Sequence, residues 1–182
     1  FVVSHTNVVL GLVETIVGLV PSGGGCKEML WRWSQTNEAL KDPDFAPLSV
    51  FEIIGYAKTA SSHEYAIPLK LLNKEDKKIM NRNDLLPESR RVLEINKKFT
   101  PPIKCKFKLS GEQVRVKMYK ILDKLIKEKK ILEHGLEVGK ELAYVLSGGK
   151  TSLEKELTEE DLYNLERESF MKLISKKKTQ ER

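Results

Sequence analysis

The chain has 182 residues, of which 40% are hydrophobic and 32% are charged. This composition argues against a disordered chain and an integral membrane protein, and the length suits one domain with a sizeable core. Lysine and arginine outnumber aspartate and glutamate by 32 to 26, and the net charge of +6 would suit an anionic partner. Two cysteines, Cys26 and Cys105, are too few for a disulfide framework and fit a reducing compartment.

Residues 1–20 are the least polar stretch, because twelve of the twenty are apolar and none is lysine or arginine. Polar residues including Glu14 interrupt the run, and a carboxylate near the middle of a bilayer costs at least ~2.5 kcal/mol. We therefore expect no membrane span, and instead buried structure. A strand-rich part is expected to be absent from the chain or confined to these residues. Because the chain begins at Phe1, inside core-like sequence, we also expect it to be a piece of something longer.

The middle of the chain has helical periodicity interrupted by turn signals. Helices are predicted over 26–40 and 48–57, over a short segment capped by Ser61 or Ser62, and from Asp84 or Pro87 through Phe99. A loop or short strand is expected around Lys77–Asn81, and residues 103–109 alternate apolar and basic side chains, which is typical of a strand.

From residue 111 to residue 174 the pattern is helical almost throughout. Gly148 and Gly149 are placed to end one helix, since glycine tolerates the left-handed backbone found there. Thr158, with Asp161 at the third helical position, is placed to begin the last helix.

None of the common metal or nucleotide motifs is present. His5, His63 and His134 are far apart in the sequence, and neither cysteine belongs to a paired motif, so we expect no metal site. The glycine run 23–25 lacks both the Lys-Ser/Thr of a P-loop and the spacing of a dinucleotide fingerprint. Cys26 follows that run at a helix start, but a small buried thiol is the simpler interpretation.

Glu14 is an isolated carboxylate between Val13 and Ile16 in the most apolar part of the chain. A buried carboxyl is costly unless it is paired or protonated, and such an environment can support acid/base chemistry near neutral pH. An interface ion pair or an exposed helical position would explain the same residue, so the residues alone leave both interpretations open.

Residues 11–25 contain a more specific motif. Glu14 is followed by an apolar stretch, Gly18, Pro21 and a glycine-rich turn that includes Gly24 and Gly25 and opens a helix. This string resembles, without gaps, the second active-site segment of the crotonase (enoyl-CoA hydratase/isomerase) superfamily.

The downstream sequence is similar to one subgroup of that superfamily. Lys27-Glu28-Met29 and the segments 51–66, 111–149 and 165–170 resemble enzymes in which a crotonase domain follows an L-3-hydroxyacyl-CoA dehydrogenase, as in the fatty acid oxidation complex α-subunit. The resemblance implies an α/β crotonase (ClpP/crotonase-like) fold, represented here mainly by its helical C-terminal part. Residues 1–60 would be the C-terminal half of the crotonase core, and residues 61–182 the helical C-terminal region with the fused-enzyme extension.

The implied function is that of a fragment of a bifunctional fatty acid β-oxidation enzyme, both a hydratase (lyase) and an oxidoreductase. In the family, two glutamates hold one water for hydration of a trans-2-enoyl-CoA, and Glu14 matches the second of them. The resemblance implies that substrate is bound by Pro21, Ser22, Gly23 and Gly24. It also implies that the backbone N–H of Ser22 lies near the catalytic water. Many members have glycine in place of Ser22.

The same resemblance implies what this segment lacks. In the family's first active-site segment, an acid follows the glycine run at the position that Lys27 occupies here. The run 23–25 is therefore not that segment, and the first glutamate and both oxyanion donors are expected before Phe1. The isolated chain is therefore expected to be inactive. This part would bind no cofactor, since acyl-CoA is the substrate and NAD belongs to the dehydrogenase. Expected partners are the acyl-CoA thioester, the missing dehydrogenase and first half of the crotonase domain, and a thiolase subunit, in the cytoplasm or a mitochondrial matrix.

Two alternatives stay open. A Δ3-Δ2-enoyl-CoA isomerase of the same family can use a single acid at the Glu14 position. A basic helical module could instead bind nucleic acid through Lys124–Lys130, although Asp123, Glu128 and Glu133 dilute its charge. The leading interpretation has no nucleic-acid partner, and it treats Lys176–Lys178 as a solvated tail.

Overall fold

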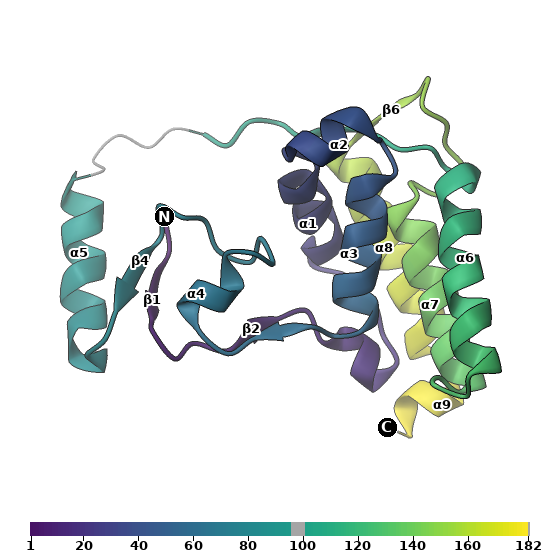
Figure 1. Cartoon of the computed structure of the whole chain (residues 1–182), viewed down its shortest axis with the longest axis horizontal. Coiled ribbons are helices and arrows are strands. Elements are labelled where there is room, and N and C mark those ends of the chain that lie inside the picture. The colour runs from purple at the N-terminus through teal and green to yellow at the C-terminus, as the bar shows by residue number, and fades with distance from the viewer. Residues whose placement is uncertain (96–100, 182) are drawn as a thin grey trace. The chain divides into compact units, whose positions relative to one another are not determined.

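The computed structural model describes residues 1–95 and 101–181, and its backbone divides into two compact units, each taken separately here (Figure 1). One unit comprises residues 1–11 and 59–103, and the other comprises residues 12–58 and 104–182. The expected functional division at residue 60, like the crotonase fold itself, stays a prediction.

The described residues of the smaller unit form two short strand pairs and three helical elements. Strand β1 (Val3–His5) pairs in parallel with β4 (Lys77–Ile79), and β2 (Leu10–Gly11) pairs antiparallel with β3 (Thr59–Ala60). The helical elements are α4 (His63–Ala66), the 3-10 helix η2 (Arg82–Asp84) and α5 (Leu85–Ile95).

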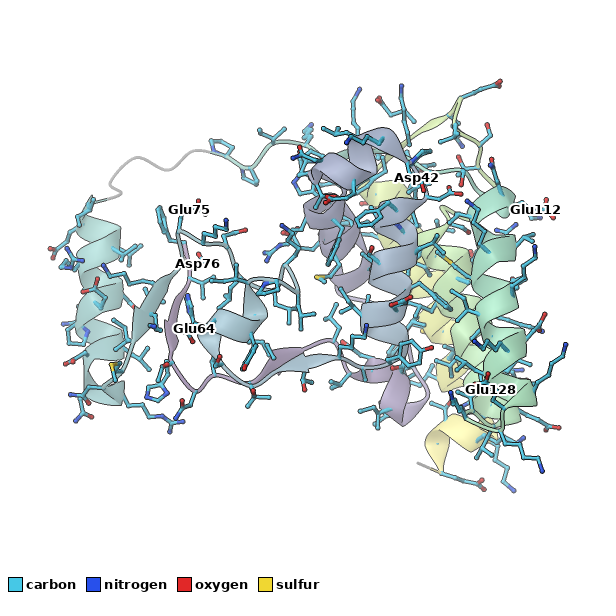
Figure 2. The ribbon with its side chains drawn as sticks, viewed as in Figure 1. Asp42, Glu64, Glu75, Asp76, Glu112 and Glu128 are labelled. Atoms are coloured by element: carbon cyan, nitrogen blue, oxygen red, sulfur yellow. The ribbon has the colours of Figure 1, made fainter. Side chains whose placement is uncertain are left out.

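Local hydrogen bonds explain how this small unit holds together. The Ser62 hydroxyl accepts the backbone N–H of Tyr65, which confirms the predicted cap of α4. Asp76, labelled in Figure 2, accepts the N–H of Val2 at 2.8 Å and of Asn73 at 2.7 Å, so it ties β1 to the turn before β4. The small core of this unit consists of Ala60, Ala66 and Leu72, with partly buried leucine and isoleucine side chains around them.

The larger unit is helical. Its elements are η1 (Glu14–Val17), α1 (Gly25–Ser34), α2 (Asn37–Lys41), α3 (Phe45–Gly55), β5 (Lys106–Lys108), α6 (Glu112–Lys127), α7 (Glu133–Leu146), β6 (Glu156–Thr158), α8 (Glu159–Ile174) and α9 (Lys177–Gln180). Helix α7 is central, because it packs against α1, α3, α6, α8 and η1, and β5 pairs antiparallel with β6. None of the described helices combines the length and the apolar character needed to cross a bilayer.

Tight packing around α7 depends on a small residue. A Cβ added to Gly139 would lie 2.5 Å from Cδ2 of Leu122 on α6, closer than side chains normally approach. Leu142 and Leu146 on the same helix are fully buried, as are Met118 of α6 and Leu162 of α8. Leu30 of α1 and Ile54 of α3 are also buried, so the core of this unit surrounds α7.

The expectation that residues 1–20 form buried structure was largely wrong. Phe1 is 78% exposed, Val9 71% and Ile16 64%, since none of the described elements covers these side chains. The strands are not concentrated there either. Strand β5 forms instead in the alternating segment 103–109, which the sequence pattern predicted, where Lys106 pairs with Glu156 of β6 at 2.6 Å.

The predicted helices are present, with changed bounds. The helix predicted over 26–40 is split, because Thr36 caps a second helix by accepting the N–H of Ala39. The helix predicted over 48–57 begins earlier, at Phe45, since Pro47 is compatible with a first helical turn. The end of the helix predicted through Phe99 lies outside the described residues.

Both helix-end predictions in the last third of the chain are confirmed. Thr158 accepts the N–H of Asp161, and the Asp161 carboxylate accepts the N–H of Thr158, which forms a capping box at the start of α8. Gly148 and Gly149, with φ of +80° and +63°, follow the end of α7.

Replacing the cap of α8 tests this assignment. We expect Thr158→Ala to lower the free energy of unfolding by ~1 kcal/mol, because an orphan N–H at the helix start loses its acceptor. Urea unfolding followed by circular dichroism measures the change. The exposed Ser152→Ala variant is the control, and equal stabilities of the two variants would contradict the assignment.

Candidate functional site

The candidate site begins at the 3-10 helix η1, which carries Glu14 as its first residue. The hydroxyl of Thr15 donates to the carbonyl of Ile54 at 2.9 Å and anchors this short helix to α3. Gly18 ends η1 with φ of +80°, and its N–H donates to the carbonyl of Thr15 at 3.2 Å. The positive φ explains why glycine stands at position 18, four residues after the glutamate.

The turn that follows requires glycine at two of its positions. Gly24 has φ of +92°, and a Cβ there would lie 2.7 Å from Cε1 of Tyr163. A Cβ on Gly25 would lie 2.8 Å from Cβ of Pro21. Gly23 has open space around it and, like Ser22, is exposed, whereas Pro21 and Gly24 are buried. The turn therefore presents Ser22 and Gly23 to solvent.

A buried carboxylate accepts hydrogen bonds from the backbone at the end of the turn. The Oε2 atom of Glu166 on α8 accepts the N–H of Gly24 at 2.6 Å, and its Oε1 atom accepts the N–H of Lys27 at 2.8 Å. The N–H of Cys26 also donates a hydrogen bond to this carboxylate. Glu166 is fully buried. Burial raises the pKa of the Glu166 carboxyl, although these backbone donors oppose the rise. Glu166 is thus a cap on α1 supplied by a different helix.

Glu14 lies close to the buried start of α1. It is half-buried, and its Oε2 atom is shielded from solvent without a hydrogen-bond partner among the described residues. An unsatisfied buried polar atom costs ~1–3 kcal/mol, so the position is unfavourable unless something else donates to it. The interface ion pair and the acid/base role both stay open as explanations of Glu14.

The thiol of Cys26 lies near both carboxylates. It is fully buried, with Sγ 4.0 Å from the carbonyl oxygen of Pro21. Burial, and then the negative charges of Glu166 and Glu14, raise the pKa of this thiol well above its ordinary value. Cys26 is therefore a neutral buried thiol, which confirms the simpler interpretation of the residue.

Lys27 and its neighbours form a charged cluster beside the turn. The Nζ atom of Lys27 lies 3.2 Å from Glu28 and 3.4 Å from Glu159, and 5.5 Å from the ring centre of Tyr163. The thiol of Cys105 bonds to the same Glu159, and burial raises its pKa to about 11. The charge of Lys27 is thus matched by two carboxylates.

Sequence reasoning missed Glu166 as a determinant of the site. A signal existed, because Glu166 lies on the same helical face as the buried Leu162, Ser169 and Leu173. A carboxylate in such a stripe needs a buried partner, but the partner is a backbone 139 residues earlier, and the sequence does not identify it.

Each of the three histidines has a hydrogen-bond partner of its own. His63 bonds to the hydroxyl of Ser4, His5 to the carbonyl of Met80, and His134 to Thr179. Within the described part of the chain, no group of histidine, cysteine, aspartate and glutamate side chains is arranged to hold a metal ion.

The comparison with curated proteins places this segment within a longer relative. The chain is 33% identical over 175 residues to a protein of Bacillus subtilis (strain 168) named "Probable 3-hydroxyacyl-CoA dehydrogenase". The match covers 95% of this chain but 22% of that protein, so the chain spans about a fifth of its relative. No protein-family model and no solved structure matches the chain. The site roles of Glu14 and the turn residues therefore stay predictions.

Removing the cap on α1 should be costly. We expect Glu166→Ala to lower the free energy of unfolding by roughly 3 kcal/mol or more, because several buried N–H groups lose their acceptor together. Chemical denaturation measures the loss. Glu168→Ala, at an exposed position of the same helix, should change stability by no more than ~1 kcal/mol. A Glu166 variant as stable as the Glu168 variant would refute the cap.

The raised pKa of Cys105 predicts its reactivity. At pH 8 we expect alkylation of Cys105 in the folded chain to be roughly 100-fold slower than that of an ordinary thiol, since the thiolate is the nucleophile. The rate should rise about tenfold per pH unit toward pH 11, because the thiolate fraction does. Mass spectrometry after timed iodoacetamide labelling gives the rates, with the urea-unfolded chain as control. Equal labelling of folded and unfolded chains at pH 8 would contradict the assignment.

Proposed function

We propose that this chain is a segment of a fused 3-hydroxyacyl-CoA dehydrogenase/enoyl-CoA hydratase, and that Glu14 supplies one acid/base carboxyl for hydration of a trans-2-enoyl-CoA. One structural observation carries the proposal. The Oε2 atom of Glu14 is buried without a hydrogen-bond partner among the described residues, beside a turn whose Ser22 and Gly23 are exposed. A carboxylate that holds a reacting water needs such an unused acceptor atom.

The relative supports the class of substrate. Its printed name refers to a 3-hydroxyacyl-CoA, and hydration of a trans-2-enoyl-CoA forms a compound of that kind. The related segment extends over nearly all of this chain, so Glu14 and the glycine turn belong to the part that the two proteins share. A role in fatty acid oxidation follows as part of the proposal.

The proposed chemistry adds one water across a carbon–carbon double bond. The water oxygen bonds to the β-carbon, the π electrons move toward the thioester carbonyl, and the α-carbon of the resulting enolate takes a proton. Glu14 would hold the water through Oε2 and deliver that proton, and the proton left by the water would restore the carboxyl. Ser22 and Gly23 are the exposed residues of the turn, and the proposal gives the backbone N–H of Ser22 a place near the reacting water.

The amides of the turn differ in what they can bind. The N–H of Gly24 donates to Glu166 and is therefore occupied within the protein. Pro21 has no N–H, and its ring contributes rigidity. Of the four predicted binding residues, Ser22 and Gly23 are the ones we propose to approach substrate, while Pro21 and Gly24 shape the turn.

The glycine-rich turn does not suit the pyrophosphate of NAD. The glycine-rich turn gives its buried amides to the Glu166 carboxylate, which would repel a pyrophosphate at the same place. The proposal therefore assigns NAD to the dehydrogenase part of the longer protein. A thiolase subunit, and a location in the cytoplasm or a mitochondrial matrix, belong to the same proposal.

The test uses the longer fused protein in which this segment is proposed to lie. Glu14→Gln keeps the shape of the side chain but cannot exchange a proton, so we expect kcat for hydration of crotonyl-CoA to fall by roughly 10²–10⁴-fold. Loss of the enoyl-thioester absorbance measures the rate. Glu38→Gln, at an exposed position of α2, is the matched control and should leave kcat unchanged.

Two results would count against the proposal. Unchanged hydration by the Glu14→Gln variant would remove the carboxyl from the mechanism. Isomerisation of a 3-enoyl-CoA by the fused protein, with no hydration of crotonyl-CoA, would favour the isomerase alternative instead. Dehydrogenase activity of the same protein, measured by NADH formation, should survive in the variant and shows that it is folded.

A further inference from the structure

A cavity in the larger unit has no role in the proposed hydration. It encloses about 270 Å³ between α3, α6 and α7, and its apolar walls include Phe51, Ile121, Leu125, Leu132 and Val138. Pockets that bind small molecules typically measure ~300–1,000 Å³, so this one lies just below that range.

Glycines on two of the helices leave this space open. A Cβ on Gly55 would meet only Leu142, at 3.8 Å, and a Cβ on Gly135 would meet only Ile131, at 3.4 Å. Neither glycine has a positive φ, so neither is required by the backbone. Gly139, by contrast, is needed where α7 meets α6. The missing side chains at 55 and 135 therefore create volume rather than relieve strain.

The interior of the cavity suits an apolar group. Its walls are mainly leucine, isoleucine, valine and phenylalanine side chains. The hydroxyl of Thr15 already donates to the carbonyl of Ile54, so it does not call for a partner inside the cavity. An apolar cavity without polar partners binds hydrocarbon better than water.

Lys130 is the one charged residue among those that line the cavity. Its Nζ lies 2.7 Å from Glu128, labelled in Figure 2 at the C-terminal end of α6, and the Lys130 side chain is 65% exposed. Lys58 lies 5.8 Å from the ring centre of Tyr56, which is half exposed and also lines the cavity. A ligand with an apolar tail inside would thus place its head group beside Lys130 and Lys58, which are paired with Glu128 and Glu52. Such exposed pairs open at little cost.

We propose that this cavity binds a medium-chain fatty carboxylate, with the aliphatic tail between α3, α6 and α7 and the carboxylate at Lys130. The apolar walls and the lysine at the rim carry the inference. The choice of an aliphatic tail over an aromatic one rests on the proposed function, in which the longer protein acts on fatty acyl compounds. The small volume selects a tail of medium length.

The direct test is a titration of the 182-residue chain with sodium butanoate, hexanoate and octanoate, followed by two-dimensional NMR. Affinity should rise about fourfold per added methylene, and shifts should concentrate at Gly55, Gly135 and Val138. Octyltrimethylammonium, which has the same tail and the opposite charge, should bind more weakly than octanoate. Equal affinity for butanoate and octanoate, or tighter binding of the cation, would overturn the proposal.

Variants separate the tail site from the head site. Gly135→Phe fills the cavity and should abolish octanoate binding, whereas Gly135→Ala adds one methyl group and should retain it. Lys130→Met should weaken octanoate about two- to fivefold, because an exposed ion pair contributes little. Leu125→Phe, a second filling variant, covers the case in which Gly135→Phe does not fold. Octanoate binding that survives in a folded filling variant would refute the site.

The outcome is separable from that of the proposed hydration. Octanoate binding needs no turnover, so Glu14→Gln should leave it unchanged even where hydration is lost. A parallel titration with octanoyl-CoA tests whether the aliphatic tail belongs to a free carboxylate or to an acyl-CoA. Perturbation of the same residues by octanoyl-CoA alone, without any effect of octanoate, would contradict a carboxylate at Lys130.

Discussion

The buried carboxylate of Glu166 is the contact on which the candidate site depends. It joins α8 to the first turn of α1 by accepting the N–H groups of Gly24 and Lys27. A buried helix N-terminus whose N–H groups lacked acceptors would be strongly unfavourable. Glu166 supplies these acceptors and so stabilises the left-handed backbone at Gly24. The position of the turn relative to Glu14 is therefore set by a residue from the far end of the chain.

This arrangement gathers negative charge in a region with little water. Glu166 and Glu14 both act on Cys26, and both raise the pKa of its thiol. The backbone donors at the start of α1 satisfy Glu166, while Oε2 of Glu14 has no such donor among the described residues. The two carboxylates thus differ in role, since one stabilises the scaffold and the other retains an unused acceptor.

Local signals in the sequence predicted local structure well. Thr158 and Asp161 form the expected capping box, and Gly148 ends its helix with a positive φ, because each feature depends on residues that are neighbours in the chain. Glu14 could likewise be singled out from its apolar surroundings. Glu166 could not, because its partners are backbone groups that carry no sequence signature. The burial of residues 1–20 was predicted wrongly, since hydropathy does not reveal whether a covering element is present.

Thr15 links the candidate site to the apolar cavity of the larger unit. It follows Glu14 in η1, its hydroxyl is fixed to Ile54 of α3, and its side chain lines the apolar cavity. Thr15 is therefore part of both the short helix that carries Glu14 and the wall of the cavity. Because a 3-10 helix of four residues has few internal hydrogen bonds, its position depends on the bond from Thr15 to Ile54 more than that of a longer helix would.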